Sequence, residues 1–144
     1  MPDLARFLEA QDAPAGGGSV YDRALAELRA GRKQTHWMWF VLPQIQGLGS
    51  SPMAQRYAIA DLAEARAYLA HPVLGARLRA CVAALNAVEG RTAHEIMGNP
   101  DDLKLRSCLT LFARATADNA DFRAALDRYY AGVEDAATVE RLGG

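Results

Sequence analysis

The side chains best suited to bind a small ligand are concentrated between Gly31 and Ser51. This stretch holds both tryptophans of the chain, one of its lysines, a histidine and an amide: Trp37, Trp39, Lys33, His36 and Gln44. An indole face stacks on a flat ring, a cation attracts an anion, and an amide both donates and accepts hydrogen bonds. Such a mixture lines pockets for polar ligands, and a buried core segment uses the same aromatic residues. The residue types leave both interpretations open.

Lys104 and Ser107 form a second candidate group. They lie three residues apart in a segment expected to be helical, so they project from the same face. A lysine can activate a serine as a nucleophile when it is desolvated and within hydrogen-bond reach of the hydroxyl. The order here is Lys-x-x-Ser, the reverse of a known serine-hydrolase order. The simpler expectation is that Lys104 pairs with Asp101 or Asp102 and that the hydroxyl bonds to a helix carbonyl.

Each candidate in the first stretch also has a purely structural interpretation. His36 can exchange a proton with a ligand, or it can pack beside Trp37 and bond to a backbone carbonyl. Lys33 can bind a carboxylate or phosphate, or it can lie in solvent after a helix C-terminus, where the helix dipole favours cations. The segment Gly47–Ser51 offers backbone N–H groups for an anion, but it lacks the lysine of a P-loop, and an ordinary turn is the better interpretation.

The sequence contains no motif for a metal or a cofactor. The three histidines are far apart, none has a second histidine or cysteine one helical turn away, and the chain has no Cys-x-x-Cys. No metal and no cofactor are therefore predicted. The two cysteines, Cys81 and Cys108, fall in apolar helical patterns and are expected to be buried, reduced thiols.

The composition is typical of one globular domain, here spanning residues 1–144. The chain is 51% hydrophobic and 23% charged, and its formal net charge is -1. This balance gives no electrostatic reason to expect a nucleic acid or an anionic membrane as a partner. No apolar segment is long enough to cross a bilayer, and the start has no charged leader before an apolar segment. We expect a cytoplasmic protein whose partner is a small molecule or a second copy of itself.

Hydrophobic spacing and capping residues predict an all-α fold. Helices are expected at 3–11, from Ser19 to Gly31, for one or two turns within 37–42, from Asp61, from Pro72 to about Gly90, at 92–98, at 103–116, around 122–133, and from Asp135 to Gly143. The helix Leu103–Thr116 is apolar on most of its circumference, Leu103 included, and is predicted to be the central buried helix. Thr35 is expected to cap the short helix at 37–42. Gly16–Gly18 predicts a flexible joint, and 46–52 predicts a loop.

Three segments give the sequence a family resemblance: GRKQTHWMWFVLPQIQGLGSS, AYLAHPVLGARL and NPDDLKLRSCLTLFARA. Over residues 7–142 the chain resembles the bacterial domain-of-unknown-function family that genomes often label "calpastatin". The resemblance implies a compact, mostly helical domain and no established reaction. The label implies a protease inhibitor, but calpastatin-type inhibition uses a disordered chain, and this composition is that of a folded core.

These observations support three hypotheses. The first is a pocket between the Lys33–Gln44 stretch and the Lys104 helix, for a small polar or anionic ligand with a flat ring, a nucleotide derivative being one class. The second is a protein-binding module that exposes Trp37 and Trp39 to a partner or a second copy. The third is that both tryptophans belong to the core. The first hypothesis leaves open whether the protein is an enzyme. The burial of the two indoles distinguishes the three hypotheses.

Overall fold

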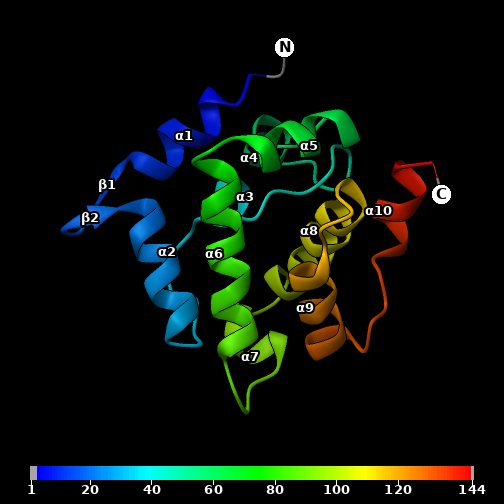
Figure 1. The fold of residues 1–144 in the computed structure, drawn as a ribbon. Coiled ribbons are helices and arrows are strands. Elements are labelled where there is room, and N and C mark those ends of the chain that lie inside the picture. Colours follow the sequence, from blue (N-terminus) through cyan, green and yellow to red (C-terminus); the bar gives the residue numbers. More distant parts are fainter. Residues whose placement is uncertain (1–2, 144) are drawn as a thin grey trace.

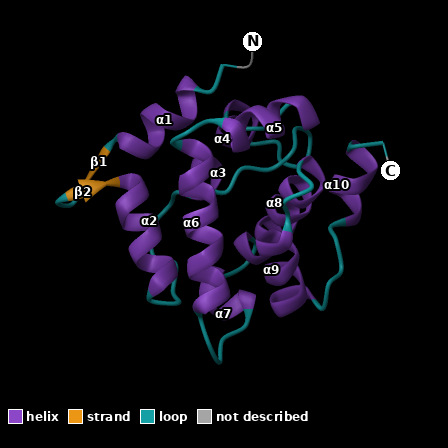
Figure 2. Cartoon of the chain, in the orientation of Figure 1, coloured by secondary structure: helices purple, strands orange, loops and turns teal. Residues whose placement is uncertain are grey.

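Ten helices and one small hairpin make up the part of the chain that the computed structural model describes, residues 3–143 (Figures 1 and 2). The all-α prediction is confirmed, since 62% of the structure is helical. The helices are α1 (Ala5–Asp12), α2 (Val20–Arg29), α3 (Met38–Val41), α4 (Pro52–Arg56), α5 (Leu62–Ala70), α6 (Leu74–Ala87), α7 (Ala93–Met97), α8 (Asp101–Ala115), α9 (Ala120–Tyr130) and α10 (Ala136–Arg141).

Helix α8 is the central helix, as its apolar circumference predicts. It packs against α5, α7, α9 and α10. From Leu105 to Ala113 every residue is buried except Arg106, whose side chain is half-buried. The prediction for Leu103 is wrong, because its side chain is 53% exposed. The helix also begins earlier than predicted, at Asp101. Its first turn therefore lies at the surface, and only the part after it crosses the core.

The glycine-rich segment after α1 is a tight hairpin and not the flexible joint that its composition predicts. Strand β1 (Pro14–Ala15) pairs antiparallel with β2 (Gly18–Ser19), and Pro14 lies opposite Ser19. The turn uses Gly16 and Gly17 at positive φ, a conformation that favours glycine. Figure 2 shows this hairpin at the edge of the molecule, joining α1 to α2.

The tryptophan stretch forms one short helical turn, α3, as predicted. Its N-terminus has no side-chain cap, because the Thr35 hydroxyl donates to the carboxylate of Glu27 instead, so the predicted Thr35 cap is wrong. The expected loop at 46–52 is partly wrong as well. Pro52 is the first residue of α4, and the Ser51 hydroxyl accepts a hydrogen bond from the backbone N–H of Ala54. A proline at the first helical position is favoured because its missing N–H has no helical partner.

Side-chain caps at four other helix starts are those that the sequence predicts. Ser19 and Thr92 each form a capping box with the acidic residue three positions on, and Asp61 and Asp135 each accept from a backbone N–H of the first turn. The imidazole of His71 accepts from two backbone N–H groups at the entry to α6.

The two thiols are buried and unpaired, as predicted, with Cys81 on α6 and Cys108 on α8. Burial raises the pKa of the Cys81 thiol to about 12 and raises that of Cys108 as well. Both thiols are therefore protonated and unreactive at neutral pH. Within residues 3–143, no helix has the length and apolar character needed to span a bilayer.

Candidate functional site

An open groove runs along the exposed first turns of α8, and we call it the α8 groove. Its volume is about 460 Å³, within the range of small-ligand sites. The α8 side consists of Leu103, Lys104, Arg106 and Ser107 together with Pro100 before the helix. The opposite side is formed by Trp39, Gln44, the loop Leu48–Ser51, Ala54 at α4, and Asp135 and Ala137 at the start of α10. Four of the seven predicted site residues thus line one groove: Trp39, Gln44, Lys104 and Ser107.

Trp39 and Lys104 form a pair within the groove. The indole is half-buried, and the Lys104 ammonium lies 5.8 Å from the centroid of its ring. The same ammonium lies 3.6 Å from Oδ1 of Asp101, one turn earlier on α8. A cation beside a partly exposed aromatic face is a suitable surface for a flat anionic molecule.

The interior next to Trp39 is too small for a ligand. A cavity lined by Met38, Leu42, Tyr57 and other neighbours of this indole has a volume of about 20 Å³. That is space for about one water molecule. Any larger molecule that contacts Trp39 must therefore approach it from the open groove.

Ser107 and Lys104 do not form a nucleophilic pair. The Ser107 hydroxyl donates to the carbonyl of Leu103 over 3.3 Å, and the Lys104 ammonium is directed to Asp101. Both contacts are the structural ones that the sequence predicts for these residues. Thr110 repeats the pattern by donating to the carbonyl of Arg106 over 2.8 Å. The Ser107 hydroxyl is thus not arranged for attack on a substrate.

Three predicted site residues lie outside the α8 groove, namely Lys33, His36 and Trp37. Lys33 is nearly buried, with its side chain 7% exposed, and its ammonium lies 2.9 Å from Oδ2 of Asp101 and 2.7 Å from the carbonyl of Thr35. The side chain of Trp37 is 1% exposed and belongs to the core. His36 is exposed on the loop before α3. The expected convergence of Lys33, His36 and Lys104 on one cavity is therefore wrong, because the ammonium of Lys33 is used in the core to neutralise Asp101.

The carboxylate of Glu27, which sequence reasoning missed, fixes the loop that leads to Trp37. Its Oε1 accepts from the backbone N–H of Gln34 at 2.8 Å, the backbone N–H of Thr35 at 3.0 Å and the indole Nε1 of Trp37 at 2.9 Å. Its Oε2 accepts from the Thr35 hydroxyl at 2.7 Å. Burial raises the pKa of this carboxyl, but the four hydrogen bonds outweigh burial and the net pKa is lowered.

Arg106 and Asp135 complete the groove and were also missed. Arg106 is one position from Ser107, but nothing in the pattern distinguishes it from an ordinary solvent-exposed arginine. Asp135 was predicted only as a helix cap, which it is: Oδ2 accepts from the backbone N–H and the hydroxyl of Thr138. Its place in the groove depends on the packing of α10 against α8, which no local pattern reveals.

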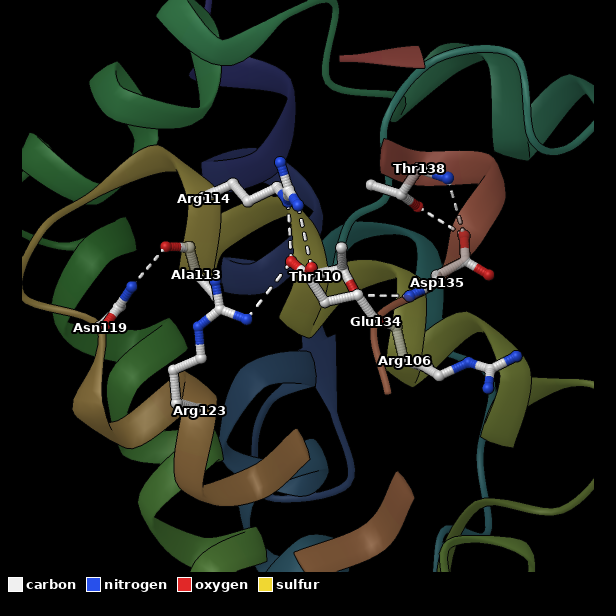
Figure 3. Close-up of polar contacts among 9 residues, drawn as sticks. All are labelled: Arg106, Thr110, Ala113, Arg114, Asn119, Arg123, Glu134, Asp135 and Thr138. Carbon is white, nitrogen blue, oxygen red and sulfur yellow. Dashed lines mark hydrogen bonds and ion pairs between the residues drawn. The ribbon is translucent and has the colours of Figure 1, made fainter. Parts of the chain in front are cut away.

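A chain of hydrogen bonds joins the start of α10 to the middle of α8 (Figure 3). The backbone N–H of Asp135 donates to the Thr110 hydroxyl at 2.9 Å, which in turn donates to the carbonyl of Arg106. Next to it, Glu134 lies 2.7 Å from Arg114 and 3.3 Å from Arg123. The hydrogen bond from Arg114 is the main reason why the pKa of Glu134 is lowered. These contacts fix the wall of the groove that α10 provides.

Fold and groove together define a small all-α domain with an open groove lined by two cations, one carboxylate and one half-buried indole. The chain belongs to the family described as "Protein of unknown function (DUF1810)", which matches residues 1–142. It is also similar to the conserved hypothetical protein Rv1873 from Mycobacterium tuberculosis, whose crystal structure is known at 1.38 Å. The two sequences are 57% identical over 99% of this chain and 97% of that chain, with a TM-score of 0.93. A search of the curated proteins finds no match.

Proposed function

We propose that the protein binds a small anionic ligand with a planar ring in the α8 groove. The observation that carries the proposal is that Trp39, Gln44, Lys104 and Ser107, from distant parts of the sequence, line one open groove of ligand size. A surface loop and a helix end that met only for stability would have no need for an exposed indole beside a cation. The proposal includes no catalysed reaction.

The charges around Lys104 support an anion as the ligand. Asp101 lies between two ammonium groups, 2.9 Å from Lys33 and 3.6 Å from Lys104. One carboxylate cannot neutralise two cations, and the shorter, more buried contact is with Lys33. Lys104 therefore retains positive charge at the groove, where an incoming carboxylate or phosphate gains a charge-assisted contact.

We place the planar ring of the ligand against Trp39, because this indole is half-buried and lines the groove. Stacking on an aromatic side chain contributes on the order of 1–3 kcal/mol for a nucleobase-sized ring. Gln44 lies on the same wall, and its side-chain amide adds a donor and an acceptor for ring substituents.

Thermal-shift measurements and tryptophan fluorescence with two sets of probes test this proposal. One set contains aromatic carboxylates such as benzoate and indole-3-acetate, and the other contains the four common nucleoside monophosphates. A ligand that binds only the folded state raises the melting temperature. We expect at least one probe to raise it and to change the fluorescence of the wild-type protein.

Three variants give this experiment its controls. Lys104→Gln is expected to weaken binding of that probe about tenfold or more, and Trp39→Phe to abolish the fluorescence response. Arg32→Gln removes an exposed cation that does not line the groove and is expected to bind as the wild type does. Unchanged binding in Lys104→Gln, or no response to either set, would contradict the proposed function.

A protein-binding role is the second candidate function, and the exposure of Leu103 favours it. This leucine, 53% exposed, lies in the same groove as Trp39. Trp37 cannot contribute, because it is buried in the core. If a second copy covers the groove, light scattering should show a dimer, and Leu103→Glu should convert it to a monomer. A monomeric wild-type protein at all concentrations would exclude the second copy as the partner.

A further inference from the structure

We propose that Arg106 is a second cation of the α8 groove, besides Lys104, that binds the ligand's anion, and that it determines ligand specificity because the ring of the ligand lies on the Lys104 side of Leu103 and the anion extends to the Arg106 side. This inference rests on the proposed function and extends it to a chemical class. The class is a planar ring joined through a linker to a phosphate-type anion, which is the overall shape of a nucleoside monophosphate.

The two cations of the groove, Lys104 and Arg106, differ in whether a carboxylate lies next to them. Lys104 has a carboxylate within 4 Å, that of Asp101. Within residues 3–143, the Arg106 guanidinium has neither an ion pair nor a side-chain hydrogen bond, and its Nε is buried without an acceptor. Figure 3 shows no hydrogen bond or ion pair from this guanidinium to the other labelled residues. A buried donor without an acceptor is unfavourable, and an anion that reaches this guanidinium displaces no hydrogen bond or ion pair.

The Arg106 guanidinium also lies beside an aromatic ring. Its central carbon lies 5.7 Å from the centroid of the Tyr130 ring, whose hydroxyl donates to the carbonyl of Asp102 at the start of α8. A guanidinium held beside a ring still presents its edge, and this edge is the fork that binds two oxygens of one phosphate. The backbone of Arg106 is fixed as well, because its carbonyl accepts the hydrogen bond of the Thr110 hydroxyl.

The positions of Trp39 and Arg106 set the shape of the ligand. Residues two apart on an α-helix project about 200° from one another, so Lys104 and Arg106 point to opposite sides of the exposed surface of α8. The ammonium of Lys104 lies beside the ring of Trp39, and the guanidinium of Arg106 lies beside the ring of Tyr130. Leu103, which also lines the groove, lies between these two directions. A ring stacked on Trp39 can reach Arg106 only if a linker separates it from the anion. Benzoate, whose carboxylate is attached directly to the ring, cannot make both contacts.

Paired titrations of nucleosides and nucleoside monophosphates test the inference. Each monophosphate and its parent nucleoside are titrated into the wild-type protein, Arg106→Gln, Arg106→Lys and Arg128→Gln by calorimetry. Arg128 is the matched control, because it also lies over a tyrosine ring, that of Tyr129, but does not line the groove. We expect one monophosphate to bind the wild type at least tenfold more tightly than its nucleoside. That difference should disappear in Arg106→Gln, recover in part in Arg106→Lys and remain in Arg128→Gln.

The outcomes separate this inference from the proposed function. If an aromatic carboxylate binds in a Lys104-dependent manner while every monophosphate fails, the groove is a ligand site but the inferred ligand class is wrong. If a monophosphate binds and Arg106→Gln retains the preference over the nucleoside, Arg106 is not the specificity-determining residue. If no probe of any kind binds, the proposed function is overturned, and this inference with it. Nucleoside affinity in Arg106→Gln shows whether the variant groove remains intact.

Discussion

Oε1 of Glu27 accepts a hydrogen bond from the indole Nε1 of Trp37 at 2.9 Å, and both side chains are buried. The contact joins α2 to the residue that precedes α3. It explains how a core tryptophan can follow a polar loop, since the same carboxylate also holds the backbone of that loop. Trp39, two residues later, is then left at the surface of the α8 groove. The two indoles thus differ, because Trp37 is bonded within the core and Trp39 lines the groove.

Replacement of this carboxylate by an amide should destabilise the protein at neutral pH. Glu27→Gln keeps the shape but loses the charge that accepts four hydrogen bonds, and hydrogen bonds to charged groups contribute about 1.5–3 kcal/mol. We expect a loss of at least about 1.5 kcal/mol in the free energy of unfolding, measured by urea denaturation at pH 7. Glu9→Gln, at an exposed position of α1, should change it by less than about 0.5 kcal/mol.

The cost of Glu27→Gln should also depend on pH in a defined direction. The pKa of Glu27 is lowered in the folded state from its ordinary value of 4.5. A lowered pKa means that the stabilisation is complete above that value and is lost as the pH falls through the folded-state pKa. The difference in stability between wild type and variant should therefore be constant from pH 7 to about pH 5 and shrink below pH 4.5. A difference that grows toward acid pH would contradict this account.

Two leucines of α8 offer a matched test of the core. Leu109 is fully buried, and Leu103 on the same helix is 53% exposed. Leu109→Ala should lower the free energy of unfolding by about 2–5 kcal/mol because it leaves a cavity. Leu103→Ala should lower it by less than about 0.5 kcal/mol. Similar effects of the two substitutions in a denaturant titration would show that the enclosed part of α8 is misassigned.

Local sequence signals predicted the helices well because their causes are local. The capping boxes at Ser19 and Thr92 and the cap at Asp61 each depend on residues within one turn, and each is present. The hydrophobic spacing of α8 was informative for the same reason. Leu103 was misjudged because periodicity reports which residues are apolar, whereas exposure depends on what covers the first turn. The first turn of α8 lies at the open groove, and Leu103 is therefore left 53% exposed.

The candidate site was only half predictable from sequence. Trp39, Gln44, Lys104 and Ser107 were found because their chemistry is that of ligand sites. The sequence did not show which tryptophan is buried, since the hydrogen bond from Trp37 to the carboxylate of Glu27 has no local signal. It could not exclude Lys33 either, because that ammonium is neutralised by an aspartate 68 positions further along the chain, Asp101.

Trp37 and Trp39 should differ in their access to a neutral quencher. In the Trp39→Phe variant only the buried Trp37 emits, so acrylamide should quench its fluorescence much less steeply than that of the wild type. Denatured samples of both proteins should quench alike, which controls for intrinsic differences between the fluorophores. Equal quenching of the folded variant and the folded wild type would mean that Trp39 is as enclosed as Trp37 and is closed to ligands.

The two lysines of the chain should differ in how much they contribute to stability. Lys33 is nearly buried and 2.9 Å from Asp101, and removal of one partner from a buried ion pair leaves an uncompensated charge, which costs up to about 3–5 kcal/mol. Lys104 remains near Asp101 and can compensate in part, so Lys33→Gln should lower the free energy of unfolding by about 1.5–3 kcal/mol. Lys104→Gln removes a more exposed ammonium, 3.6 Å from the Asp101 carboxylate, and should lower the free energy of unfolding by less than about 1 kcal/mol.

Urea denaturation of both variants and of the double variant tests this. The double variant should lose more free energy of unfolding than the sum of the single losses, because only then is Asp101 without a cation. Strict additivity would show that Asp101 does not couple the two lysines, and the retained charge of Lys104 at the groove would need another explanation.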